Sequence, residues 1–116
     1  MTQKNCAFDL EEREGELWIC VRGEMDHHSA VALRVELDKI LLEKKPRRAV
    51  LNLSEIGFMD SSGLGFVMGR YSFLQKLGGE LVLEDPNERV ARIFALAGLE
   101  RIIKIQKNDV EKEKVK

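Results

Sequence analysis

Apolar and polar residues follow two different spacings along the first half of the chain, and these spacings predict its first elements. Apolar residues stand two apart at residues 8–10, and the apolar run 17–21 follows shortly after, which predicts two strands joined by a tight turn. Between residues 30 and 41 the apolar positions recur every three or four residues, with charged residues between them, until Pro46 interrupts the pattern. This spacing predicts an amphipathic helix.

The middle of the chain has a strand pattern followed by a helix pattern. Residues 49–53 are apolar except for Asn52, as expected of a central strand that helices cover on one or both faces. Apolar residues then recur at helical spacing from Leu64 to Leu77, and two glycines follow at 78–79. Because glycine adopts the left-handed backbone that ends many helices, we expect this helix to stop there after about four turns.

A further strand and helix are predicted in the last third of the chain. The apolar run 81–83 predicts another buried strand. After it, we expect Asp85 to cap the next helix, Pro86 to occupy the first helical position and Glu88 to reach back toward the cap. Apolar residues at helical spacing between 90 and 97 predict the inner face of that helix.

Together these elements predict an α/β fold, a single domain with a small mixed sheet of about four to five strands and helices packed against it. A last strand at 102–105 completes the sheet, so we assign residues 1–106 to the domain. Residues 107–116 form a charged tail with only two apolar residues, which bury too little surface to offset the entropy of ordering the segment. We therefore expect the tail to be mobile or a frayed helix.

Length and charge narrow the classes of function. The 116 residues suffice for one domain, and 19 basic against 20 acidic residues provide no electrostatic attraction to nucleic acid or anionic lipid. Cys6 and Cys20 have no zinc or redox spacing, and the first residues lack the apolar core of a signal peptide. No apolar run approaches the roughly 18 to 20 residues that span a bilayer. We therefore expect a cytoplasmic protein whose partner is another protein or a small molecule.

An acidic residue followed by two hydroxyl residues stands where the central strand gives way to a helix. Asp60, Ser61 and Ser62 occupy this position. The first N–H groups of a helix are unpaired and lie at the positive end of its dipole, so an exposed anion there is stabilised by about 0.3 to 1 kcal/mol. A phosphorylated serine would fit this site, but Asp and Ser are also the ordinary capping residues of helices. The residues alone leave both interpretations open.

Other motifs that carry chemistry are incomplete. Gly63, Gly65 and Gly69 do not have the spacing of a dinucleotide-binding loop, and we expect close packing to explain the first two. His27 and His28 are adjacent, so on a helix they point about 100 degrees apart and cannot readily bind one metal ion together. Neither serine of the turn stands in the Gly-x-Ser-x-Gly sequence of hydrolases. We therefore predict no catalytic, cofactor-binding or metal-binding residues.

Two motifs resemble those of the anti-anti-sigma factors of the STAS domain family. They are Gly-Glu-Met-Asp-His-His at 23–28 and Phe-Met-Asp-Ser-Ser-Gly-Leu-Gly at 58–65, with Gly-Arg-Tyr following at 69–71. The resemblance, strongest to the sporulation-type antagonists of anti-sigma-F factors, continues to Ile105 and leaves out only the charged tail. It implies a small mixed sheet flanked by helices, and a protein that binds its cognate anti-sigma kinase so that the sigma factor is released for transcription.

The same resemblance implies site residues and partners. Ser61 matches the family's phosphorylated serine, and Ser62 matches the neighbour that shapes the turn. Asp26 matches the acidic residue of the first motif, and we expect it to cap the first helix and to lie near Ser61 on the surface that faces the kinase. The expected partner-binding residues are Asp26, Asp60, Ser61, Ser62 and Gly63. The implied partners are an anti-sigma serine kinase and a serine phosphatase.

The resemblance requires no catalytic residue and no cofactor, and it implies no direct contact with nucleic acid or membrane. We expect the free chain to be a monomer. The alternative, from another class of function, is a STAS-type regulatory domain that binds a small ligand or a nucleotide.

Overall fold

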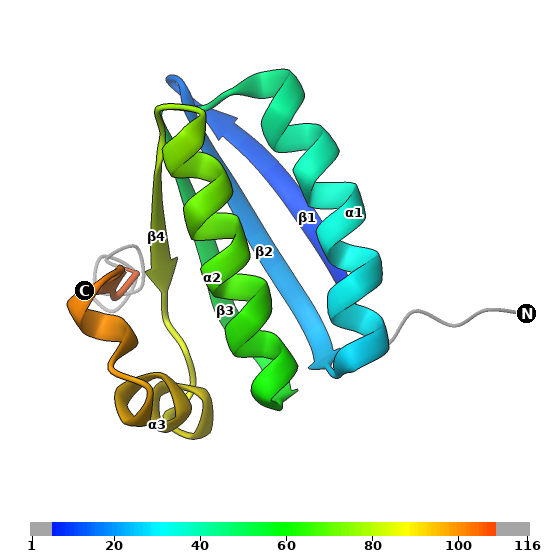
Figure 1. Cartoon of the computed structure of the whole chain (residues 1–116), viewed down its shortest axis with the longest axis vertical. Coiled ribbons are helices and arrows are strands. Elements are labelled where there is room, and N and C mark those ends of the chain that lie inside the picture. The colour runs from blue at the N-terminus through cyan, green and yellow to red at the C-terminus, as the bar shows by residue number, and fades with distance from the viewer. Residues whose placement is uncertain (1–5, 109–116) are drawn as a thin grey trace, which may run out of the picture.

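The computed structural model describes residues 6–108, so the expectations for residues 1–5 and for the tail beyond Asn108 lie outside the described residues. Within this range the chain folds into one five-stranded sheet in the order β1-β2-β3-β4-β5, with three α-helices (Figure 1). The α/β fold predicted from the sequence is confirmed. The elements are β1 (Cys6–Arg13), β2 (Glu16–Met25), α1 (His27–Lys44), β3 (Arg48–Met59), α2 (Ser61–Lys76), β4 (Glu80–Glu84), α3 (Glu88–Leu96), the short 3-10 helix Leu99–Arg101 and β5 (Lys104–Gln106).

The sheet is mixed because its first connection is a hairpin and the others are helical crossovers. β1 and β2 are antiparallel and are joined by a turn at Glu14 and Gly15, whose φ angles are 48° and 84°. The pairs β2–β3, β3–β4 and β4–β5 are all parallel. Parallel strands require a crossover, which α1, α2 and α3 supply, so the carboxyl ends of β2, β3 and β4 meet at the same edge of the sheet.

α1 and α2 lie side by side across one face of the sheet (Figure 1). Leu33, Leu37 and Leu41 recur along α1 at helical spacing and are buried, and Val67 and Leu74 do the same on α2. Burial of one leucine side chain contributes about 1.5 to 3 kcal/mol, so these contacts hold both helices firmly on the sheet. Among residues 6–108, no helix combines the length and the apolar character that crossing a bilayer requires.

The opposite face of the sheet carries polar side chains. Successive residues of a strand point to opposite faces, which places Cys20, Asn52 and Glu84 in one row across β2, β3 and β4. Glu84 is only 2% exposed, and its carboxylate accepts hydrogen bonds from Asn52 Nδ2 at 2.7 Å and Gln106 Nε2 at 3.1 Å. The helical layer of α1 and α2 therefore covers one face of the central strand and not both.

α3 begins at a different residue from the predicted one. Asn87 is its N-cap, since Asn87 Oδ1 accepts a hydrogen bond from the N–H of Val90 at 2.8 Å. The prediction that Asp85 caps this helix and that Pro86 takes the first helical position is therefore wrong. Asp85 has a φ of 50° and accepts a hydrogen bond from Asn108 N. Asn87 is favoured because its Nδ2 also donates to Ile56 O at 2.7 Å, which ties the start of α3 to β3.

Candidate functional site

Two strands end side by side in this fold, and each is followed directly by an aspartate that begins a helix. Met25 and Met59, the last residues of β2 and β3, are paired in the parallel register. Asp26 then caps α1 and Asp60 caps α2, with nearly identical backbone angles of φ -102° and ψ -175° for the first and φ -102° and ψ -168° for the second. The N–H of Asp60 donates to Met25 O at 3.4 Å. The starts of α1 and α2 therefore share one edge of the sheet.

The aspartates, and not the serines, perform the capping. Asp26 Oδ1 accepts a hydrogen bond from Ser29 N at 2.9 Å, and Asp60 Oδ1 accepts one from Ser62 N at 2.8 Å. A cap of this kind contributes about 1 kcal/mol to helix stability. Ser61 follows the cap as the first residue of α2 and is exposed. Its hydroxyl is thus not needed to hold the helix and is accessible for modification.

Gly63 makes the sharp turn from β3 into α2 possible. A Cβ atom at this position would lie 2.1 Å from Met59 Cγ and 2.5 Å from Met59 Sδ. Met59 is only 3% exposed, so it cannot easily move aside. Gly63 is itself buried and lies in the turn beneath Ser61 and Ser62.

Two glycines leave part of the outer face of α2 near Ser61 without side chains. Gly65 is exposed and Gly69 is half-buried, and a Cβ atom added at either position would meet no atom within 4 Å. The expectation that close packing explains Gly65 is therefore wrong, although it is correct for Gly63. Ser61, Gly65 and Gly69 are four residues apart and lie on the same side of the helix. This face leaves the backbone of α2 open to close approach by another molecule.

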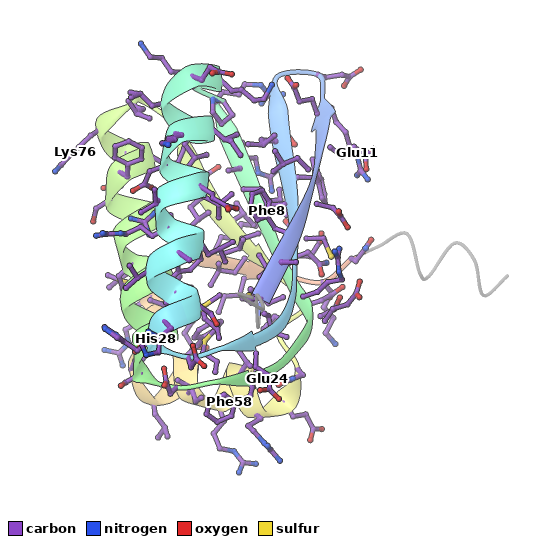
Figure 2. The ribbon with its side chains drawn as sticks, turned by 90° about the vertical axis from the view of Figure 1, so that its right-hand side faces the viewer. Phe8, Glu11, Glu24, His28, Phe58 and Lys76 are labelled. Atoms are coloured by element: carbon purple, nitrogen blue, oxygen red, sulfur yellow. The ribbon has the colours of Figure 1, made fainter. Side chains whose placement is uncertain are left out.

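The edge that carries Ser61 is acidic. Asp26, Asp60 and the exposed Glu24 lie at the ends of β2 and β3, and Figure 2 shows Glu24, His28 and Phe58 at this end of the molecule. The carboxylate of Asp26 acts on the nearby Cys6. The pKa of the Cys6 thiol is raised to about 11, mainly by burial and to a smaller extent by the negative charge of Asp26. A further negative charge at this edge meets repulsion from the same carboxylates.

Two histidines begin α1 at this edge. The rings of His27 and His28 are 5.9 Å apart in an edge-to-face arrangement, and both side chains are exposed. Within residues 6–108, no group of three or more potential metal ligands comes together, at the histidines or elsewhere. The side chains that the edge presents include carboxylates, imidazoles and hydroxyls.

A partly buried ion pair, which sequence reasoning missed, joins the two helices that begin at the site. Arg70 of α2 is 6% exposed, and its Nε lies 2.7 Å from Asp38 Oδ1 of α1, while its Nη2 donates to Asp38 Oδ2 at 3.3 Å. Burial lowers the pKa of Arg70, and Asp38 opposes this effect. Removing Asp38 would leave the buried charge of Arg70 uncompensated, so the pair stabilises the packing of α1 against α2.

The sequence matches the family model described as the STAS domain over residues 7–111. The chain belongs to the STAS domain family. It is 36% identical over 106 residues to the anti-sigma F factor antagonist of Paenibacillus polymyxa, a match that covers 91% of this chain and 91% of that protein. The resemblance found in the two sequence motifs is thereby confirmed.

Solved STAS structures have the same fold. The unphosphorylated form of the anti-sigma factor antagonist SpoIIAA matches with a TM-score of 0.75 and 28% identity, covering 94% of this chain and 96% of that one. The phosphorylated form of the Bacillus cell fate determinant SpoIIAA matches with a TM-score of 0.69 and 27% identity, covering 95% of this chain and 100% of that one. STAS relatives thus include an antagonist whose structure exists in both states.

Proposed function

We propose that this STAS domain is an anti-anti-sigma factor of the cytoplasm. In its unphosphorylated state it binds an anti-sigma serine kinase and so releases the sigma factor, and phosphorylation of Ser61 by that kinase switches the binding off. A serine phosphatase restores the binding state. The observation that carries the proposal is the position of Ser61, which is exposed at the start of α2 while Asp60 performs the capping.

The local charges give a physical reason for the switch. A phosphate adds about -1.5 to -2 charges, and beside Asp60 and Asp26 in a protein interface it is repelled and costly to desolvate. One lost hydrogen bond and one unfavourable charge contact together cost roughly 3 kcal/mol, which lowers affinity by roughly a hundredfold. The start of α2 stabilises the phosphate through the helix dipole, so the modified domain stays folded. Binding changes without refolding.

The remaining site residues have distinct roles in this proposal. Asp26 and Asp60 hold the two helix starts on the surface that faces the kinase. Ser62 donates its N–H to Asp60 and keeps the turn in shape, while Gly63 lets β3 turn into α2. The free chain binds the kinase as a monomer, and it contributes no catalytic group, because the kinase and the phosphatase supply the chemistry.

Mass spectrometry after incubation with the cognate kinase and ATP tests the proposal. We expect one phosphate, located on Ser61, and none in the Ser61→Ala variant. Phosphate on Ser62 alone would contradict the choice between the two serines and move the modified hydroxyl by one position. A chain that accepts no phosphate and does not bind the kinase would contradict the proposed function as a whole.

A cavity on the polar face of the sheet favours a second candidate, a domain that binds a small ligand. It measures about 310 Å³, and Trp18, Cys20 and Glu84 are among the residues that line it. Trp18 Nε1 is buried there without a hydrogen-bond acceptor among residues 6–108. Calorimetry with ATP or GTP separates the two functions. Saturable heat with a nucleotide, together with no binding to the kinase, would favour the ligand-binding domain over the anti-anti-sigma factor.

A further inference from the structure

The exposed side of α3 presents two cations and one apolar side chain in a row. Arg89, Arg92 and Leu96 are three and four residues apart and therefore share one face of the helix. All three are exposed, and Leu96 reaches 84%. The other side of the helix carries Val90 and Phe94, which are fully buried. The inner side of α3 therefore packs into the core, and its outer side is exposed to solvent or to a partner.

This row borders a cleft at the end of β3. The cleft measures about 610 Å³ and is lined by Gly57, Asn87, Glu88, Arg89 and Arg92. The hydrogen bond from Asn87 Nδ2 to Ile56 O holds its two walls together. Phe58, which follows Gly57, is 42% exposed, and Figure 2 shows it at the same end of the molecule as Glu24 and His28. We call Gly57, Phe58, Arg89, Arg92 and Leu96 the α3 surface.

The two arginines of the α3 surface have no polar partner within the described part of the chain. Arg89 and Arg92 form no hydrogen bond or ion pair with another residue between 6 and 108. Glu88 lies in the first turn of α3, where a carboxylate is favoured by the helix dipole, so the charged groups that line the cleft sum to one positive charge. Two arginines without internal partners favour a ligand that brings its own carboxylates.

The α3 surface continues directly into the edge that carries Ser61. Gly57 and Phe58 stand three and two residues before Asp60 in β3, so the chain itself joins the two regions. One region is acidic, through Glu24, Asp26 and Asp60, and the other is basic. A surface that is acidic on one side and basic on the other selects one orientation of a partner with complementary charges.

We propose that the α3 surface docks an acidic segment of the same anti-sigma kinase, with an apolar side chain of that segment packed on the exposed Leu96. This inference rests on the proposed function and extends it, because it assigns a second contact region to the kinase and gives that region its chemistry. The acidic segment pairs with Arg89 and Arg92 and so steers the kinase onto Ser61. Charge pairs at the rim of an interface act mainly on the association rate and weaken with salt.

Association kinetics of the full-length chain with the purified cognate kinase test this inference. We expect Arg89→Glu/Arg92→Glu to associate about tenfold more slowly at about 0.05 M salt, and about twofold more slowly at about 0.5 M salt. Arg89→Gln/Arg92→Gln should lie between this variant and the wild type. Lys39→Glu/Lys76→Glu is the matched control, because it makes the same change in net charge at two exposed sites. Lys39 lies roughly 18 Å along α1 from its first residue, and Lys76 lies roughly 22 Å along α2 from its first residue. It should remain within about twofold of wild type.

The outcomes separate this inference from the proposed function. If the wild-type chain binds the kinase in a phosphorylation-dependent way while the arginine variant associates as fast as the control, only the docking inference is overturned. If the wild type does not bind the kinase, both fail. Sedimentation velocity on the same proteins tests whether a second copy of this chain binds the α3 surface instead. Self-association of the wild type that the arginine substitutions abolish, while kinase binding stays intact, would assign the surface to that second copy and overturn the docking inference.

Discussion

Gly65 offers a sharp test of how α2 is used, because a single methyl group there should raise stability and lower binding. Gly65 lies inside α2 and is exposed, and a Cβ atom at this position would meet no atom within 4 Å. Alanine is more favourable than glycine in a helix interior by about 0.8 to 1 kcal/mol, since it restricts the unfolded chain. Gly65→Ala should therefore raise the free energy of unfolding by about 0.5 to 1 kcal/mol.

Urea unfolding measures this change through Trp18, the only tryptophan of the chain. The midpoint should rise while the slope of the transition stays constant. Gly63→Ala is the matched comparison on the same helix, and it should destabilise, because its Cβ atom would lie 2.1 Å from Met59 Cγ. An unchanged or lower stability for Gly65→Ala would refute the view that this position is free of contacts within the chain.

Binding of the same variant to the kinase measures the second half of the prediction. Gly65 lowers the stability of its own helix and contacts nothing in the free chain. Close packing of the kinase against the backbone of α2 would explain why a glycine stands there. An added methyl group in such a contact costs about 1 to 3 kcal/mol, so affinity should fall at least about fivefold. Unchanged affinity in a more stable Gly65→Ala variant would refute a role for this face in binding.

Three further predictions concern single side chains at the same edge. Ser61→Ala should bind the kinase but escape inactivation by it, and Ser61→Asp, with only part of the charge of a phosphate, should weaken binding partially in a titration against the kinase. Asp60→Ala should lower the free energy of unfolding by about 1 kcal/mol in urea melts, because it removes the cap of α2. Stability should fall as the pH rises from 9 toward 11, because the pKa of Cys6 is raised to about 11 and the unfolded chain loses this proton first. Urea melts at several pH values should show a shallower decline for Cys6→Ala.

Local patterns were sufficient to predict most elements of the fold. The spacing of leucines in α1 and α2 predicted both helices, although each begins three residues earlier than its first apolar residue indicated. Gly78 has a φ of 85° and Gly79 N donates to Leu74 O at 2.8 Å, as expected of glycines that end a helix. These features depend only on near neighbours in the chain, which is why the sequence reveals them.

Features that depend on distant residues were not predicted. The cap of α3 moved to Asn87 because this side chain also bonds to Ile56, on another strand. β3 continues to Met59, well beyond the apolar run 49–53, because β2 also pairs with its second half, where polar and apolar residues are mixed. The position of Asp26 beside the start of α2 follows from that same pairing, and it was expected from the family resemblance, not from the local pattern of residues. Gly65 was misread because exposed and packed glycines look alike in a sequence.

In the proposed function, one phosphate on Ser61 decides whether the chain binds its kinase. The most direct test compares the dissociation constants of the unmodified protein and the protein phosphorylated at Ser61, measured against the same kinase at the same salt concentration. We predict binding that is weaker by roughly a hundredfold for the phosphorylated protein, with the helical content of both forms unchanged. Equal dissociation constants for the two forms would contradict the account.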